Sequence, residues 1–277
     1  LNENGIKYTV FSDIVPNPTK ENVWSGLKAF KKSKADVIFA LGGGSVIDTA
    51  KAIGIVRNNP KFNDLVSLSG TANTMNKSVP IFAFPTTSGT AAEVTINYVI
   101  TDEDRGVKMV CVDPNDIPMV AFLDAELMAS MPKSITASTG MDALTHAIEC
   151  LITKGAWDMS DMFALEAIKV IAKYLKRAYD NGGDIEARDK MAYAQYVAGM
   201  GFSNVGLGIV HSMAHPLGGR FNIAHGTANA MILPTVMKYN MESASLPKYR
   251  LIAEAFGVNT AKLTDEQAGK KAVACVE

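Results

Sequence analysis

The sequence of 277 residues is poor in cysteine and carries no excess of either charge. Its three cysteines, Cys111, Cys150 and Cys275, are too few and too far apart for a disulfide framework. This predicts a reducing compartment, and we expect the cytoplasm. The 27 basic and 28 acidic residues give a formal net charge of -1, and no basic run is of the kind that would track a phosphate backbone. Nucleic acid is therefore not an expected partner.

Long apolar runs without polar interruption are also missing. The longest stretch without a charged side chain, residues 191–219, has the length of a membrane span. It contains several glycines, Gln195, Asn204 and two histidines. We therefore expect a helix buried in a soluble bundle, and no membrane partner. A hydrophobic content of 48% in a chain of this length suits a globular protein with room for two domains.

Histidine is scarce, and its four occurrences fall in the second half of the chain, at His146, His211, His215 and His225. Asp142 stands four residues before His146, so a helix would place both on one face. Imidazoles with one carboxylate suit iron, zinc, manganese or cobalt, and the absence of paired thiolates argues against a structural zinc site of the cysteine type. The alternative is four unrelated histidines. Their almost uncharged surroundings disfavour it, because burying unpaired imidazoles is costly.

Two periodicities follow one another along the chain. Up to about residue 130, β-branched or aromatic runs alternate with helical patterns. The predicted strands are residues 8–11, 37–41, 80–84, 97–101, 107–112 and 119–124, and the clearest helices are residues 21–32 and 46–57. Such alternation is typical of βαβ units and a parallel sheet, with a β-hairpin around the charged turn 102–106.

From Pro132 onward only helical periodicity is found, with helix ends expected at Gly182-Gly183, Gly218-Gly219 and Gly257. We therefore predict an α/β domain over residues 1–130 and an all-helical domain over residues 131–277.

Two loops of the first domain suit a nucleotide. Residues 42–45, Gly-Gly-Gly-Ser, follow a predicted strand and open a helix, so a pyrophosphate could approach the backbone and the free amide groups of the helix N-terminus. Because this is not the usual GxGxxG pattern, glycines that serve only the turn are an open alternative. Residues 85–93 follow another strand and offer hydroxyl groups. Open α/β sheets bind ligands at such carboxyl ends of strands.

Two further runs carry a family resemblance. Residues 121–149, which include Asp142 and His146, and residues 208–226, which include His211, His215 and His225, resemble the two signatures of the iron-containing (group III) alcohol dehydrogenases. The loops at residues 42–45 and 85–87 are similar to that family's nucleotide loops, and the similarity extends from residue 17 to about residue 257. The resemblance implies a Rossmann-like nucleotide-binding domain followed by a helical metal-binding domain, as in the dehydroquinate synthase-like architecture.

The resemblance also implies roles for single residues. A divalent metal, Fe2+ in preference to Zn2+, is expected on Asp142, His146, His211 and His225. His215 is expected near the nicotinamide as the catalytic proton shuttle. Pro216 is expected to end or bend the helix there, which separates His215 from His211. The implied contacts to NAD, with NADP as an open alternative, are Asn17, Gly43, Gly44, Ser45, Asp48, Thr86, Thr87, Asn97 and Lys108.

Three other residues near these sites can be explained without a direct role in binding or catalysis. Lys51, three residues after Asp48, is expected to form an ordinary surface ion pair. Cys150 follows His146 by four residues, and we expect a small buried hydrophobic residue rather than a ligand. Arg220 is expected either to alter the rim of the pocket or to be solvated.

The implied reaction is hydride transfer between the nicotinamide and a small primary alcohol or aldehyde, with the metal acting on the substrate oxygen. Lactaldehyde and 1,2-propanediol are the favoured pair, with other short alcohols or 1,3-propanediol as the alternative. A lyase resembling dehydroquinate synthase is disfavoured, because that enzyme uses a Glu/His/His ligand set. A binding module with a vestigial site is disfavoured by the intact ligand set. Family members usually start earlier and end later, so we expect an internal part of a longer, homodimeric enzyme.

Overall fold

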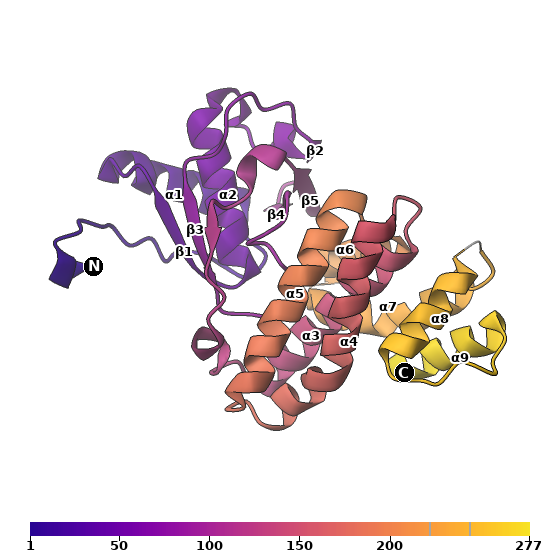
Figure 1. The fold of residues 1–277 in the computed structure, drawn as a ribbon. Coiled ribbons are helices and arrows are strands. Elements are labelled where there is room, and N and C mark those ends of the chain that lie inside the picture. The colour runs from indigo at the N-terminus through magenta and orange to yellow at the C-terminus, as the bar shows by residue number, and fades with distance from the viewer. Residues whose placement is uncertain (222, 244) are drawn as a thin grey trace. The chain divides into compact units, whose positions relative to one another are not determined.

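The computed structural model describes residues 1–221, 223–243 and 245–277 (Figure 1). The chain divides into two compact units, one made of Leu1–Pro85 and Ala92–Phe122, the other of Thr86–Ala91 and Leu123–Glu277. The first unit is α/β and the second is helical, so the predicted fold class is confirmed. The boundary between the units lies between residues 122 and 123, whereas the sequence predicted it near residue 130. The segment 86–91 packs with the helical unit, although it directly follows a strand.

The first unit contains a parallel sheet in the order β1-β3-β6. Its strands are β1 (Ile38–Gly42), β3 (Ile81–Pro85) and β6 (Val120–Ala121). Ile38 lies opposite Ile81, and Phe82 lies opposite Val120. The predicted parallel sheet is therefore confirmed, although β6 is much shorter than the predicted strand at residues 119–124.

A second sheet has the order β2-β5-β4. Its strands are β2 (Gly70–Thr71), β4 (Asn97–Asp102) and β5 (Val107–Val112), and β4 pairs antiparallel with β5 as the predicted hairpin. The predicted strand at residues 8–11 is wrong, because this segment is irregular chain. Tyr8 and Val10 are exposed there, and an alternating pattern forms a strand only where a partner edge is available.

Two helices complete the core of the first unit. They are α1 (Lys20–Ser33) and α2 (Gly44–Asn58), close to the predicted ranges. The side chain and backbone of Thr19 exchange hydrogen bonds with Asn22, a capping box that starts α1. Helix α2 packs against β1, β3 and β4 and is buried from Thr49 to Val56. It therefore has almost no solvent-exposed face.

The described residues of the second unit form only helices, short 3-10 turns and loops. Its helices are α3 (Lys133–Ile152), α4 (Asp158–Asp180), α5 (Ile185–Val205), α6 (Ile209–Phe221), α7 (His225–Asn240), α8 (Leu246–Ala255) and α9 (Asp265–Val276). Helix α4 lies beside both α3 and α5, and α8 packs on α9 (Figure 1). Helices α4 and α8 end just before Gly182 and Gly257, as predicted.

Helix α6 departs from the prediction. It passes through Pro216, Gly218 and Gly219 and ends at Phe221, so the expected helix end at the glycine pair is wrong. At Pro216, where an end or a bend is expected, the helix does not end. A proline removes one backbone hydrogen bond inside a helix. Pro216 lies on the exposed side of α6, where water can satisfy the carbonyl that has lost its donor.

The uncharged stretch at residues 191–219 divides between α5 and α6. Gly206, with a φ of 79°, caps the end of α5, and α6 begins three residues later. Among the residues that the structure describes, no helix combines the length and apolar character that crossing a membrane requires.

Candidate functional site

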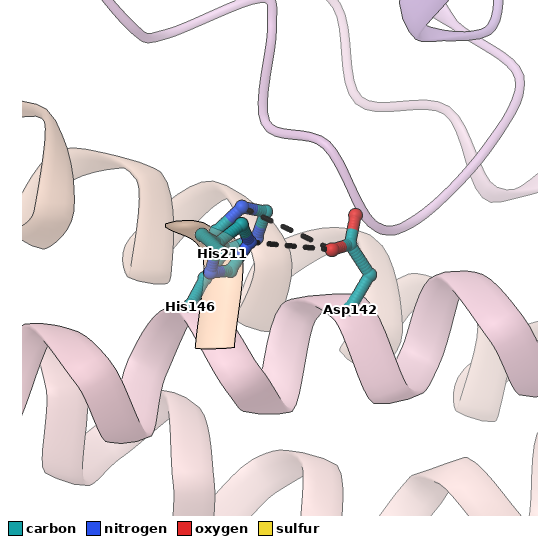
Figure 2. A group of neighbouring side chains, drawn as sticks. All are labelled: Asp142, His146 and His211. Atoms are coloured by element: carbon teal, nitrogen blue, oxygen red, sulfur yellow. Dashed lines mark ion pairs between the residues drawn. The ribbon is translucent and has the colours of Figure 1, made fainter. Parts of the chain in front are cut away.

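Three helices of the second unit bring four predicted metal ligands together. Asp142 and His146 lie one turn apart on α3, His211 lies on α6, and His225 begins α7. The Nε2 atoms of His225, His211 and His146 lie 3.5, 3.6 and 4.0 Å from Oδ1 of Asp142. Figure 2 shows Asp142 and His146 rising from one face of α3, with the rings of His146 and His211 beside the carboxylate. One carboxylate oxygen is thus faced by imidazole nitrogens from three directions.

Asp142, His146 and His211 are buried, whereas the side chain of His225 is 27% exposed, and the charges of the three buried residues depend on their burial. Burial alone would raise the pKa of Asp142, but His146, His225 and His211 hold this pKa well below its usual range. Burial lowers the pKa of His146 to about 3, so that ring is neutral. Burial also opposes the charged form of His211, yet its contacts with Asp142 and Glu149 raise its pKa to about 9. A charged carboxylate beside imidazoles is a ligand set for a divalent cation, which would take the place of the His211 proton.

Glu149 is a residue of this cluster to which the sequence assigned no role. Its Oε2 lies 2.6 Å from Nδ1 of His211, and its Oε1 accepts a hydrogen bond from the backbone N–H of Val210 at 2.7 Å. Glu149 follows Asp142 by seven residues and His146 by three, so it continues the same face of α3. That spacing was the available signal.

Asn229 is a second residue without a predicted role. It lies one turn after His225 on α7 and is fully buried. Its Nδ2 donates to Oδ1 of Asp142 at 2.7 Å and lies 3.2 and 3.3 Å from Nε2 of His211 and His225. The signal was again a spacing of four residues from a predicted ligand.

His215 lies beside the cluster. It follows His211 by one turn of α6, and its ring centre is 6.1 Å from that of His211 and 5.1 Å from that of His225. The rings of His211 and His215 are perpendicular. The imidazole rings of His211 and His215 are therefore oriented differently, even though α6 continues through Pro216.

Predicted nucleotide contacts of the first unit meet at the start of α2. The backbone N–H of Asn17 donates to Oγ of Ser45 at 3.3 Å, and Nζ of Lys108 donates to Oδ1 of Asn17 at 2.7 Å. Gly43 caps α2 and Gly44 begins it, so free amide groups are available there. Gly42 has a packing role, because an added Cβ would lie 2.5 Å from a methyl group of Val46.

The next turn of α2 carries Asp48 and Lys51. Oδ2 of Asp48 accepts a hydrogen bond from the backbone N–H of Val99 at 3.1 Å, and burial raises the pKa of Asp48 to about 7. Nζ of Lys51 donates to the carbonyl oxygens of Thr95 at 2.5 Å and Asn97 at 2.9 Å. The predicted surface ion pair is therefore wrong: Lys51 is fully buried, because α2 is enclosed at this turn.

The remaining predicted positions lie as follows. Thr86 and Thr87 follow β3 directly and are half-buried members of the second unit. Cys150 is a buried residue whose Sγ contacts the backbone of Ser160, in agreement with the hydrophobic interpretation. Arg220 is exposed near the end of α6, which favours the solvated alternative.

Family comparison covers nearly the whole chain. The family model described as "Iron-containing alcohol dehydrogenase" matches residues 1–125, and the model described as "Fe-containing alcohol dehydrogenase family, C-terminal" matches residues 136–277.

Individual relatives agree with this match. Lactaldehyde reductase of Escherichia coli K12 is 54% identical over 272 residues, which span 98% of this chain and 70% of that protein. The crystal structure of a 1,3-propanediol oxidoreductase superposes with a TM-score of 0.95 at 42% identity, covering 99% of this chain and 71% of the other. A sulfoacetaldehyde reductase from Bifidobacterium kashiwanohense in complex with NAD+ superposes with a TM-score of 0.85 at 31% identity, covering 97% and 70%.

Proposed function

Because the chain belongs to the iron-containing alcohol dehydrogenase family, we propose that it is a metal-dependent oxidoreductase that transfers a hydride between NAD(P)(H) and a small primary alcohol or aldehyde. The observation that carries this proposal is the cluster around Asp142, where Nε2 atoms of three histidines lie within 4.0 Å of one carboxylate oxygen. Scattered histidines of structural origin would not converge in this way.

The proposed metal ligands are Asp142, His146, His211 and His225. Their donor set fits a divalent ion, because it combines one carboxylate held in its charged form with imidazole nitrogens. The family favours Fe2+, although Zn2+ suits the same donors. When bound, such an ion supplies a Lewis acid that polarises the substrate oxygen.

The first unit is proposed to hold the nicotinamide cofactor, NAD in preference to NADP. Most of the proposed contacts lie in this unit, namely Asn17, Gly43, Gly44, Ser45, Asp48, Asn97 and Lys108, and the remaining two, Thr86 and Thr87, belong to the second unit. The hydrogen bonds that join Asn17 to Ser45 and Lys108 support a common site, and the amide groups at the start of α2 suit a pyrophosphate. The NAD+ complex of the sulfoacetaldehyde reductase supports the choice of cofactor.

His215 is proposed to move the proton that accompanies hydride transfer. An imidazole titrates near neutral pH and is well suited to this task. The ring of His215 lies beside that of His225, with centres 5.1 Å apart. The ring of His215 is therefore near the proposed metal centre, but it is perpendicular to the ring of His211.

Lactaldehyde and 1,2-propanediol are the proposed substrate pair. The support is the 54% identity to lactaldehyde reductase, against 42% for the 1,3-propanediol oxidoreductase that represents the second candidate. We further propose a cytoplasmic homodimer; Cys111, Cys150 and Cys275 are all free thiols, which is in keeping with a reducing compartment.

The test is a turnover assay of the metal-loaded protein with NADH and NADPH against a panel of short aldehydes. We expect the highest kcat/KM with lactaldehyde and the reverse reaction with 1,2-propanediol. A preference for 3-hydroxypropanal would favour the second candidate. Absence of turnover with every aldehyde, in protein that binds both metal and cofactor, would reject the proposed function.

A further inference from the structure

Glu149 carries a buried carboxylate that the proposed reaction does not use. It lies on α3, three residues after His146, and is 1% exposed. Burying a carboxylate costs free energy unless hydrogen-bond donors compensate it. Its partners therefore show what holds it in place.

Those partners all belong to the start of α6. The backbone N–H groups of Val210 and His211 donate to Glu149 at 2.7 and 3.4 Å, and Nδ1 of His211 lies 2.6 Å from Oε2. The first N–H groups of a helix have no partner within the helix, and the helix dipole favours a negative charge there. Glu149 thus caps α6 and contacts the ring of His211 with the same carboxylate.

This arrangement decides which edge of His211 is available. The short contact with a carboxylate requires that Nδ1 carries a proton, so Nε2 is the nitrogen that can bind an ion once its own proton has left. Nε2 is the atom that lies 3.6 Å from Oδ1 of Asp142. The ring also stacks on that of His146, with centres 4.4 Å apart and planes 18° from parallel.

We propose that Glu149 is a positioning residue of the metal centre, which fixes the His211 ring so that Nε2 faces Asp142 and the ion. This role rests on the proposed metal-dependent function. Carboxylates that bind the second nitrogen of a ligating histidine orient the ring and increase its basicity, and their removal commonly weakens metal binding by about 10- to 100-fold.

Gly208 shows how closely this carboxylate is held. An added Cβ at Gly208 would lie 2.7 Å from Oε1 of Glu149. Gly208→Ala is therefore a second, milder way to move the carboxylate without removing it.

The test measures the affinity of the protein for Zn2+ by chelator competition, with the absorption spectrum of the Co2+ form as a report on ligand geometry. We expect Glu149→Gln to weaken Zn2+ binding by about 10- to 100-fold and to change the Co2+ spectrum. Gly208→Ala should give a smaller change in the same direction. Cys150→Ala is the matched control, because Cys150 is the next residue of α3 and its Sγ contacts the backbone of Ser160, away from His211. This variant should lose stability but keep its Zn2+ affinity.

Zn2+ affinity within twofold of the wild type in folded Glu149→Gln would overturn the proposal. An equal loss of affinity in Cys150→Ala would also overturn it, because general loosening of α3 would then explain the effect. Neither measurement uses a cofactor or an aldehyde. A protein that binds Zn2+ as expected but reduces no aldehyde would therefore reject the proposed reaction and leave the role of Glu149 standing.

Discussion

Asp142 in the second unit and Asp116 in the first unit are both buried, at 3% and 0% exposure, yet their pKa values move in opposite directions. The pKa of Asp142 lies well below its usual range, despite its burial. Burial raises the pKa of Asp116 to about 8. At neutral pH Asp142 is therefore charged, whereas Asp116 is protonated.

The difference lies in the donors around each acid. Asp142 faces imidazoles from three helices and accepts a hydrogen bond from Asn229. Within the described part of the chain, neither oxygen of Asp116 has a hydrogen-bond donor, although Nζ of Lys51 lies 3.6 Å away. That ammonium group donates instead to the carbonyl oxygens of Thr95 and Asn97.

Burial alone therefore does not decide whether these acids are charged; the surrounding donors decide it. The cluster of the second unit is arranged to stabilise negative charge, which prepares it for a cation. In the first unit, the buried ammonium group of Lys51 holds the backbone at the start of β4, where Asn97 is a proposed cofactor contact.

The largest difference is expected from one substitution made in both regions. Asp142→Asn removes the charge that the imidazoles face, so we expect loss of most bound metal and a fall in turnover on the order of a thousandfold or more. Asp116→Asn replaces an acid that is already protonated at neutral pH, and we expect unchanged metal content and turnover within about threefold. Elemental analysis and turnover assays measure both. Equal effects of the two substitutions would contradict the conclusion that Asp142 is charged and Asp116 is protonated.

How far the sequence predicts these regions depends on how rare their residues are. Histidine is scarce, so His146, His211 and His225 are conspicuous in the sequence. The four-residue spacing between Asp142 and His146 adds a carboxylate to them, and the structure brings all four residues together. Glu149 and Asn229 satisfy the same helical spacing, but they are common residue types that usually lie on exposed faces. Only the packing of α3 and α6 against α7 distinguishes them from surface residues.

In the first unit, too, the local sequence does not reveal which helix faces are buried. Lys51 follows Asp48 by three residues, a pattern typical of a solvated helix face, and the enclosure of α2 is decided by segments distant in sequence. The strands around residues 38–42 and 81–85 are readable because apolar runs there are bounded by turn residues. Residues 8–11 carry a similar pattern without a partner strand. Local pattern therefore predicts the elements well, and long-range packing decides which of their faces are buried.

The cofactor loop gives the next largest effect and should leave the second unit untouched. A side chain at Gly44 would obstruct the start of α2, so Gly44→Val should weaken NADH binding by roughly a hundredfold or more while metal content stays constant. Fluorescence titration with NADH measures the affinity. Gly183→Ala is a suitable control, because the added Cβ would meet no atom closer than 3.4 Å. Normal NADH affinity in Gly44→Val would assign the glycines to turn geometry alone.

Within the second unit, His215 is proposed to carry a proton, whereas the other three histidines are proposed metal ligands. His215→Ala should retain metal and cofactor but lose about two orders of magnitude in turnover, as is typical when a general acid or base is removed. The pH-rate profile should also flatten between about pH 6 and 9. Metal content, NADH affinity and turnover across pH are measured on one preparation. Loss of metal would make His215 a ligand instead.

The smallest expected effect is a difference in pH dependence between the two units of the metal-free protein. Burial raises the pKa of Asp48 to about 7 and that of Asp116 to about 8. Unfolded aspartates titrate near 3.9, so above about pH 4 the folded first unit binds more protons than its unfolded form. Its stability should therefore fall as pH rises toward 7.

The second unit should respond in the opposite sense over part of this range. Burial lowers the pKa of His146 to about 3, whereas an unfolded histidine titrates near 6.5, so between these values the unfolded form binds more protons and stability rises with pH. Up to about pH 5.5, His211, with a pKa of about 9, is protonated in both states and adds almost no slope. Between about pH 4.5 and 5.5, amide-exchange protection, corrected for the intrinsic rate, should decrease in α2 and increase in α3. Asp116→Asn should reduce the change in α2 and leave α3 as it is; protection that moves in the same direction in both helices would contradict the opposite pKa shifts on which the comparison rests.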